Sequence, residues 1–136
     1  ADVQVDSQPC PLFVPLVENG RFRQGDVVIE TVAREYLTPL MEAGVDTLIL
    51  GCTHYPLLKD IIGEICGPGV TLIDSGAASA RALRQQLAAE GQLTDRQQGE
   101  TRFYVSDRPE DFEKLAAVFL EEPLSRGAER IDIEQY

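Results

Sequence analysis

The chain has 136 residues, 43% of them apolar, which suits one compact domain with a core and argues against disorder. Twelve Lys and Arg stand against 23 Asp and Glu, giving a formal net charge of −11 that disfavours direct binding to nucleic acid. The sequence shows no leader-like segment and no uncharged apolar run of bilayer length, so we expect a cytoplasmic protein without a membrane partner.

The first forty residues predict an extended segment, a loop and a helix. Residues 4–11 are interpreted as a strand or an extended approach. Prolines interrupt the apolar run 12–17, which we interpret as a loop that packs on the core. Helical spacing of apolar residues then predicts a helix that Asp26 caps and Gly44 ends.

Short apolar strands alternate with longer helices along the rest of the chain. The predicted elements are a strand at 46–51, a helix at 56–66, a strand at 70–74, a helix at 76–90 with Ser75 as its cap, a loop at 91–100, a strand at 101–106, a helix at 109–120 and a strand at 129–133. This alternation is typical of βαβ units, so the predicted fold class is α/β with a parallel sheet.

The segment Gly51 to Pro56 is the strongest candidate site, because ligands of open α/β sheets bind at the carboxyl ends of strands, beside helix N-termini. Gly51 permits a close backbone approach, and Thr53 is a plausible helix cap beside an anion site. Cys52 is then expected to have a lowered thiol pKa, with His54, the one histidine, as a partner in proton transfer.

Less reactive interpretations stay open on residue chemistry alone. The three cysteines, Cys10, Cys52 and Cys66, lack the pattern of a disulfide framework, and a free cysteine is often simply buried. Cys52 and His54 are also compatible with a hydrolase or transferase nucleophile. No second pair stands at metal-ligand spacing, so no metal site is predicted.

Two motifs resemble the glutamate racemases of the aspartate/glutamate racemase family. Leu48 to Leu58 resembles the family's second cysteine motif, and Cys10 to Gly20 resembles its acidic loop. Ile73 to Gly76 and Phe103 to Asp107 are weaker matches. The resemblance covers nearly the whole chain and corresponds to the C-terminal part of such an enzyme.

The resemblance implies a racemase that uses no cofactor and interconverts L- and D-glutamate, supplying D-glutamate for peptidoglycan. The resemblance also implies that two thiols, on opposite faces of a carbanion-like intermediate, exchange the α-proton. Cys52 matches the second thiol, with His54 supporting it and Glu18 as the acidic partner of His54. Thr53 and Gly51 would bind the substrate. Related aspartate racemases tend to have Glu where this chain has His54, which favours glutamate.

The family's first cysteine motif, with its Asn, and its Asp-Ser-Gly loop are missing from the sequence, and neither Cys10 nor Cys66 replaces the absent thiol. The resemblance therefore implies a catalytic lobe at 1–75 and a segment at 76–136 that returns to complete the first lobe. The fold expected is one lobe of a pseudo-symmetric two-lobe racemase plus part of the other. Alone, the chain is expected to be inactive, with the missing N-terminal half as its partner and a homodimer as an alternative. A Cys–His hydrolase and a non-catalytic acidic interaction domain remain the rival functions.

Overall fold

The computed structural model describes residues 3–96, 99–120 and 122–135. The helices and strands, in chain order, are α1 (Phe13–Glu18), α2 (Val27–Glu42), β1 (Thr47–Leu50), the 3-10 helix η1 (Tyr55–Leu58), α3 (Lys59–Cys66), β2 (Thr71–Asp74), α4 (Ser75–Ala89), β3 (Tyr104–Val105), α5 (Pro109–Leu120), β4 (Glu129–Arg130) and the 3-10 helix η2 (Ile133–Gln135). The chain divides into two compact units, residues 1–93 and residues 94–136.

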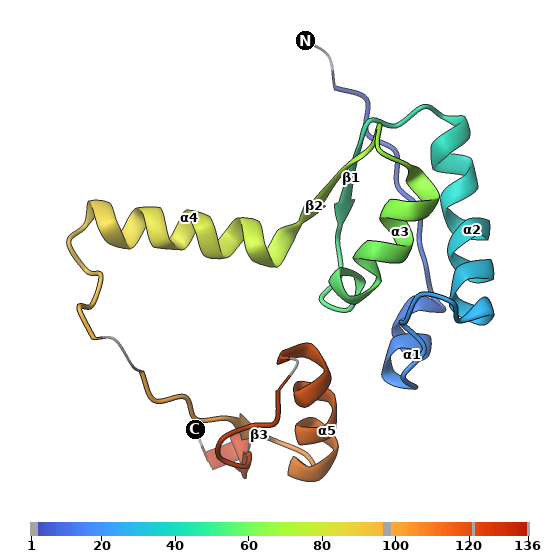
Figure 1. Cartoon of the computed structure of the whole chain (residues 1–136). Helices are drawn as coiled ribbons and strands as arrows, with labels where there is room; N and C mark the ends of the chain where they lie inside the picture. Colours follow the sequence, from blue (N-terminus) through green and yellow to red (C-terminus); the bar gives the residue numbers. More distant parts are fainter. Residues whose placement is uncertain (1–2, 97–98, 121, 136) are drawn as a thin grey trace. The chain divides into compact units, whose positions relative to one another are not determined.

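The first unit is built on a parallel pair of strands. β1 and β2 pair with Thr47 opposite Thr71 and Leu50 opposite Asp74. Figure 1 shows α2 and α3 on one side of these strands. The buried core joins these elements to α1, and its most deeply buried large side chains are Phe13, Val17, Ile29, Leu50, Leu58 and Ile62.

α2 follows the sequence prediction closely. The carboxylate of Asp26 accepts a hydrogen bond of 3.0 Å from the Val28 amide, which satisfies one of the free N–H groups of the first turn. Gly44 adopts φ +73° after the last turn, a left-handed conformation that glycine reaches without strain. The apolar face between these two ends buries Ile29, Ala33 and Leu37.

The apolar run after Cys10 is a helix, so our prediction of a loop was wrong. α1 begins at Phe13, which places Pro15 in the first turn, where a missing N–H breaks no helical hydrogen bond. The prediction that this run packs on the core is confirmed, because Phe13 and Val17 are each 1% exposed. No strand is assigned among residues 3–11, which agrees with the extended alternative.

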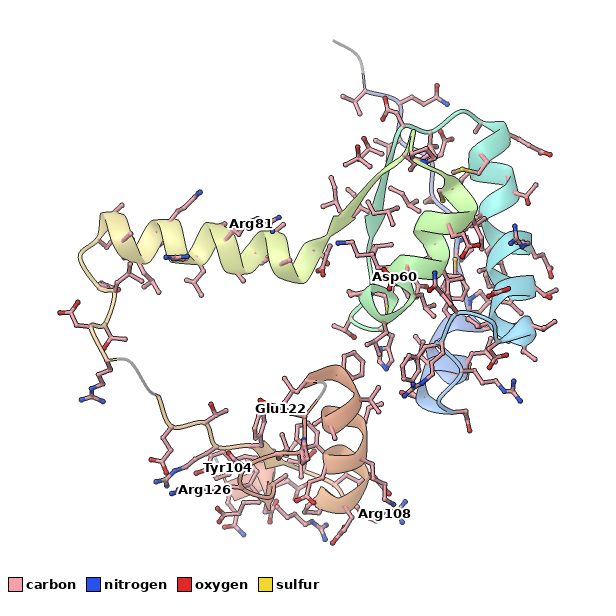
Figure 2. The ribbon with its side chains drawn as sticks, in the orientation of Figure 1. Asp60, Arg81, Tyr104, Arg108, Glu122 and Arg126 are labelled. Atoms are coloured by element: carbon pink, nitrogen blue, oxygen red, sulfur yellow. The ribbon has the colours of Figure 1, made fainter. Side chains whose placement is uncertain are left out.

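α4 begins at the residue after β2 but is capped differently from our prediction. The Asp74 carboxylate accepts a hydrogen bond of 3.0 Å from the Ala77 amide and is the N-cap, whereas Ser75 is the first helical residue. None of the fifteen residues of α4 is buried. In Figure 2 the side chain of Arg81 stands out from this exposed helix.

The second unit holds β3, α5 and β4, with β3 and β4 parallel. The predicted helix 109–120 is confirmed, and the two predicted strands are present but shorter than expected, at two residues each. Phe103 contacts Phe112 with ring centroids 5.7 Å apart. Residues 97 and 98 of the predicted loop 91–100 lie outside the described residues.

Candidate functional site

The candidate site begins where β1 ends. Gly51 and Cys52 follow Leu50 directly, and the Tyr55 amide donates a hydrogen bond of 3.2 Å to the Cys52 carbonyl, which closes a tight turn. η1 follows, with Pro56 in its first turn. Cys52 thus lies at the carboxyl end of a parallel strand, as the sequence predicts.

His54 and Glu18 come together at this turn from different elements. Nε2 of His54 lies 3.3 Å from Oε1 of Glu18, the last residue of α1. Nδ1 of His54 lies 3.1 Å from Oγ1 of Thr53. A carboxylate oxygen thus lies beside one ring nitrogen and a hydroxyl beside the other, and the tautomer of the ring decides which nitrogen carries the proton. The predicted proximity of Glu18 to His54 is confirmed.

Thr53 is not a helix cap, which corrects our prediction. The residue at the N-cap of η1 is His54, and no side chain caps that helix. The Thr53 hydroxyl instead faces the imidazole of its neighbour. The predicted helix 56–66 is also divided, because η1 covers four residues and α3 starts only at Lys59. A 3-10 turn that continues directly into α3 therefore stands beside Cys52, where we expected the first turn of an α-helix.

Ser75, the first residue of α4, binds the end of β1. Its hydroxyl donates a hydrogen bond of 3.2 Å to the Leu50 carbonyl, next to Gly51. This bond explains why Ser75 does not cap α4, since Asp74 reaches the free amides while Ser75 faces the sheet. The turn that carries Cys52 is thus tied to the end of β2 as well as to α1 through His54.

Gly51 borders open space within the first unit. A Cβ built on Gly51 would meet no heavy atom of the described residues within 4 Å, and its φ is not among the positive values. Neither the backbone conformation nor a neighbouring side chain therefore requires glycine at this position. The open space leaves room for another molecule to approach the backbone beside Cys52.

The three cysteines are free thiols in different surroundings. Cys10 is buried, and burial raises the pKa of its thiol, while a hydrogen bond with Tyr55 partly offsets the rise. Burial also raises the pKa of the Cys66 thiol at the end of α3. Cys52 is only partly buried and stands at the turn described above.

Tyr55 is a site residue that our sequence analysis did not single out. Its hydroxyl donates a hydrogen bond of 3.4 Å to the Cys10 carbonyl, and its ring meets Phe13 edge to face at 5.3 Å. Burial raises the pKa of Tyr55, and negative charge on the Cys10 and Cys52 thiolates raises it further. Tyr55 therefore links the segment before α1 to the Cys52 turn. Its place directly after His54 was the one available signal.

Two further observations bear on the kind of site. Among residues 3–96, 99–120 and 122–135, no group of three or more His, Cys, Asp or Glu side chains is placed to hold a metal ion. Within the same ranges, every helix is too short or too polar to cross a membrane.

The chain is similar in sequence to bacterial glutamate racemases. It is 48% identical to that of Shouchella clausii over 120 residues, which are 88% of this chain and 42% of the relative. The racemase of Syntrophus aciditrophicus is 41% identical over 134 residues, 97% of this chain and 48% of the relative. The chain thus spans less than half the length of these curated relatives. No protein-family model matches it.

Solved structures give the same result for the fold. A glutamate racemase from Thermus thermophilus, in complex with beta-chloro-D-alanine, matches with a TM-score of 0.83 at 40% identity, covering 95% of this chain and 48% of the other. One from Francisella tularensis, in complex with D-glutamate, matches with a TM-score of 0.80 at 34% identity, covering 95% and 47%. By sequence and by its α/β fold, the chain is similar to about half of a glutamate racemase.

Proposed function

We propose that this chain supplies one acid/base face of a cofactor-independent glutamate racemase. The observation that carries the proposal is the meeting of His54 and Glu18, 3.3 Å apart, on the turn that holds Cys52 at the end of β1. Because the chain is similar to glutamate racemases, we assign glutamate racemisation to this arrangement. The solved Francisella tularensis racemase is in complex with D-glutamate.

Each residue has a separate role in the proposed reaction. The Cys52 thiolate removes the α-proton of L-glutamate, or its thiol returns a proton in the reverse direction. His54, placed beside Glu18 and Thr53, supports Cys52 in this proton transfer. Thr53 and Gly51 line the position of the substrate carboxylate, where the open space above Gly51 supports close approach.

Inversion needs a second thiol on the opposite face of the planar intermediate, and we assign it to the part of a racemase that this chain does not span. The product, D-glutamate, would serve peptidoglycan synthesis, and the cytoplasm is the compartment that we propose. Residues 1–75 are the catalytic lobe in this proposal, and residues 76–136 complete the other lobe. The absence of buried residues from α4 supports a role for that helix in packing against a further part of the enzyme.

A Cys–His hydrolase is the less favoured function. It would require an imidazole nitrogen on the Cys52 sulfur to activate it. The nitrogens of His54 lie 3.1 Å from Thr53 Oγ1 and 3.3 Å from Glu18 Oε1, which suits a positioned proton carrier better.

Incubation of the chain with L-glutamate in deuterated water tests the proposal. NMR follows deuterium at the α-carbon, and chiral chromatography follows configuration. We expect slow exchange with retained configuration, because one thiol reaches only one face. Cys52→Ser should reduce exchange by about 10²-fold or more, the usual contribution of a general acid/base group. Cys66→Ser is the matched control and should exchange at the parent rate.

The two possible failures of this experiment have different meanings. Full inversion by the isolated chain would show that both acid/base groups lie within it. Equal exchange by the parent chain and Cys52→Ser would remove Cys52 from the reaction.

A further inference from the structure

The parallel ladder between β1 and β2 ends directly before the candidate site. At the start of the strands, the Thr71 amide donates a hydrogen bond of 2.8 Å to the Asp46 carbonyl. The bonds of a parallel ladder recur evenly along both strands. Because Leu50 is paired with Asp74, the same pattern brings the Leu50 carbonyl opposite residue 75. Residue 75 is therefore the position from which the last carbonyl of β1 can be held.

Ser75 occupies this position and uses its side chain as the donor. It is the first residue of α4, where β2 passes directly into the helix (Figure 1). Its hydroxyl donates a hydrogen bond of 3.2 Å to the Leu50 carbonyl. The free amides of the first turn of α4 do not compete for this hydroxyl, because the Asp74 carboxylate accepts from the Ala77 amide. A side-chain hydroxyl thus holds the end of β1.

Gly51 is the joint between this carbonyl and Cys52. Glycine has the widest conformational freedom of any residue, and a Cβ built on Gly51 would meet no heavy atom of the described residues within 4 Å. On the far side of the joint, the Cys52 carbonyl accepts a hydrogen bond of 3.2 Å from the Tyr55 amide. The position of the Cys52 thiol relative to the sheet therefore depends on the hydrogen bonds from Ser75 and Tyr55, on either side of the glycine.

We propose that Ser75 is a positioning residue for the Cys52 thiol. Because the peptide unit is planar, a hydrogen bond that holds the Leu50 carbonyl also fixes the direction in which the chain enters Gly51. Proton transfer is sensitive to small displacements of the reacting group, so this restraint acts on the rate of the reaction. The inference rests on the proposed function, because the thiol that Ser75 positions is the proposed acid/base group.

Four variants of the chain separate the hydroxyl of Ser75 from the rest of its side chain. Ser75→Ala removes the hydroxyl. Ser75→Val and Ser75→Thr have the same branched shape, but only the threonine keeps a hydroxyl. Ser79→Ala is the matched control, because Ser79 is an exposed serine about one turn later in α4. Circular dichroism and the thermal midpoint confirm that each variant is folded, and if Ser75→Ala is unfolded, the valine and threonine variants decide the question.

The first measurement is the steady-state kinetics of α-deuterium exchange from L-glutamate in deuterated water. Ser75→Ala and Ser75→Val should lower kcat by about threefold to tenfold, which corresponds to the usual net contribution of one hydrogen bond. Their KM should stay at the parent value, because Ser75 contacts the backbone of β1 and has no proposed contact with the substrate. Ser75→Thr and Ser79→Ala should exchange at close to the parent rate.

The second measurement, nitrogen-15 relaxation of the Gly51 and Cys52 amides, needs no reaction. Their order parameters should fall from about 0.85 in the parent chain and Ser75→Thr towards about 0.6 in Ser75→Ala and Ser75→Val.

Four results would overturn the inference: unchanged exchange in the variants that lack the hydroxyl, a loss that Ser75→Thr does not restore, a loss confined to KM, or equal order parameters in all variants. The proposed function is judged separately, since a parent chain that shows no exchange would reject the racemase proposal. The order parameters would then decide by themselves whether Ser75 holds the Cys52 turn.

Discussion

At the scale of single residues, the candidate site depends on contacts between residues far apart in sequence. His54 is held between its neighbour Thr53 and Glu18, which belongs to α1. The hydroxyl of Tyr55 donates a hydrogen bond to the carbonyl of Cys10, which lies shortly before α1 in the chain. The adjacent residues His54 and Tyr55 therefore both bind the Cys10–Glu18 region, and together they set the position of the Cys52 turn.

We predict that Cys52 is alkylated faster than Cys10 and Cys66 near neutral pH. Burial raises the pKa of the Cys10 and Cys66 thiols, so less of each is thiolate, the form that reacts with iodoacetamide. Cys10 is also only 8% exposed. Time-resolved mass spectrometry of the adducts measures the three rates. Equal rates for all three thiols would contradict the prediction.

The hydroxyl of Tyr55 is predicted to control the pH dependence of Cys10. The Tyr55 side chain lowers the pKa of the Cys10 thiol against the larger rise from burial, so Tyr55→Phe should move the alkylation profile of Cys10 to higher pH. Loss of one partly buried hydrogen bond should also lower the free energy of unfolding by about 1 kcal/mol. The alkylation rate of Cys10, measured from about pH 8 to about pH 11, gives this profile, because the range extends above the usual thiol pKa.

Tyr36→Phe is the control for this variant. Tyr36 also meets Phe13 edge to face, at 5.3 Å, but it belongs to α2 and is not among the causes of the raised pKa of Cys10. Its removal should leave the profile of Cys10 unchanged. A shift of similar size in both variants would mean that ring packing, and not the Tyr55 hydroxyl, sets the pKa of Cys10.

At the scale of elements, burial separates isoleucines that the sequence alone presents as similar. Ile62 of α3 is 1% exposed, whereas Ile49 of β1 is 64% exposed. Both stand in apolar runs, Leu48–Leu50 and Ile61–Ile62. The helix places Ile62 against the core, and the strand alternation turns Ile49 away from it.

Ile62→Ala should lower the free energy of unfolding by about 2–5 kcal/mol, because it removes a packed side chain and leaves a cavity. The same substitution at Ile49 should cost less than about 1 kcal/mol, mostly through lower strand propensity. Urea denaturation followed by circular dichroism measures both values. Similar losses at the two positions would show that Ile49 is covered in the isolated chain.

At the scale of the whole molecule, the described core belongs almost entirely to the first unit. Of the buried apolar residues among the described ranges, Ala116 alone lies in residues 94–136. We therefore predict that backbone amides of α5 exchange with deuterium faster than those of α2 and α3, since local stability follows buried apolar contacts. Hydrogen exchange with mass spectrometry resolves these helices. Stronger protection of α5 than of α2 would refute this distribution of stability.

Sequence reasoning located most elements of the fold, and its errors have identifiable causes. Asp26, Gly44 and the spacing between them define α2, because caps and apolar periodicity act over a few residues. The loop assigned to residues 12–17 was wrong, since a proline in the first turn of a helix does not prevent it. The cap assigned to Ser75 was wrong because the neighbouring strand offered its hydroxyl a carbonyl.

The sequence by itself determined the alternation of strands and helices, the motif around Cys52 and the relationship to racemases, because these depend on residue types at short spacing. Only the tertiary structure decided which residues meet at the site. Glu18 and His54 are 36 positions apart in the sequence, and α1 must pack beside the Cys52 turn to bring them within 3.3 Å. The exposure of Ile49 was likewise decided by tertiary packing, since strand periodicity assigns a residue to a face but does not say whether that face is covered.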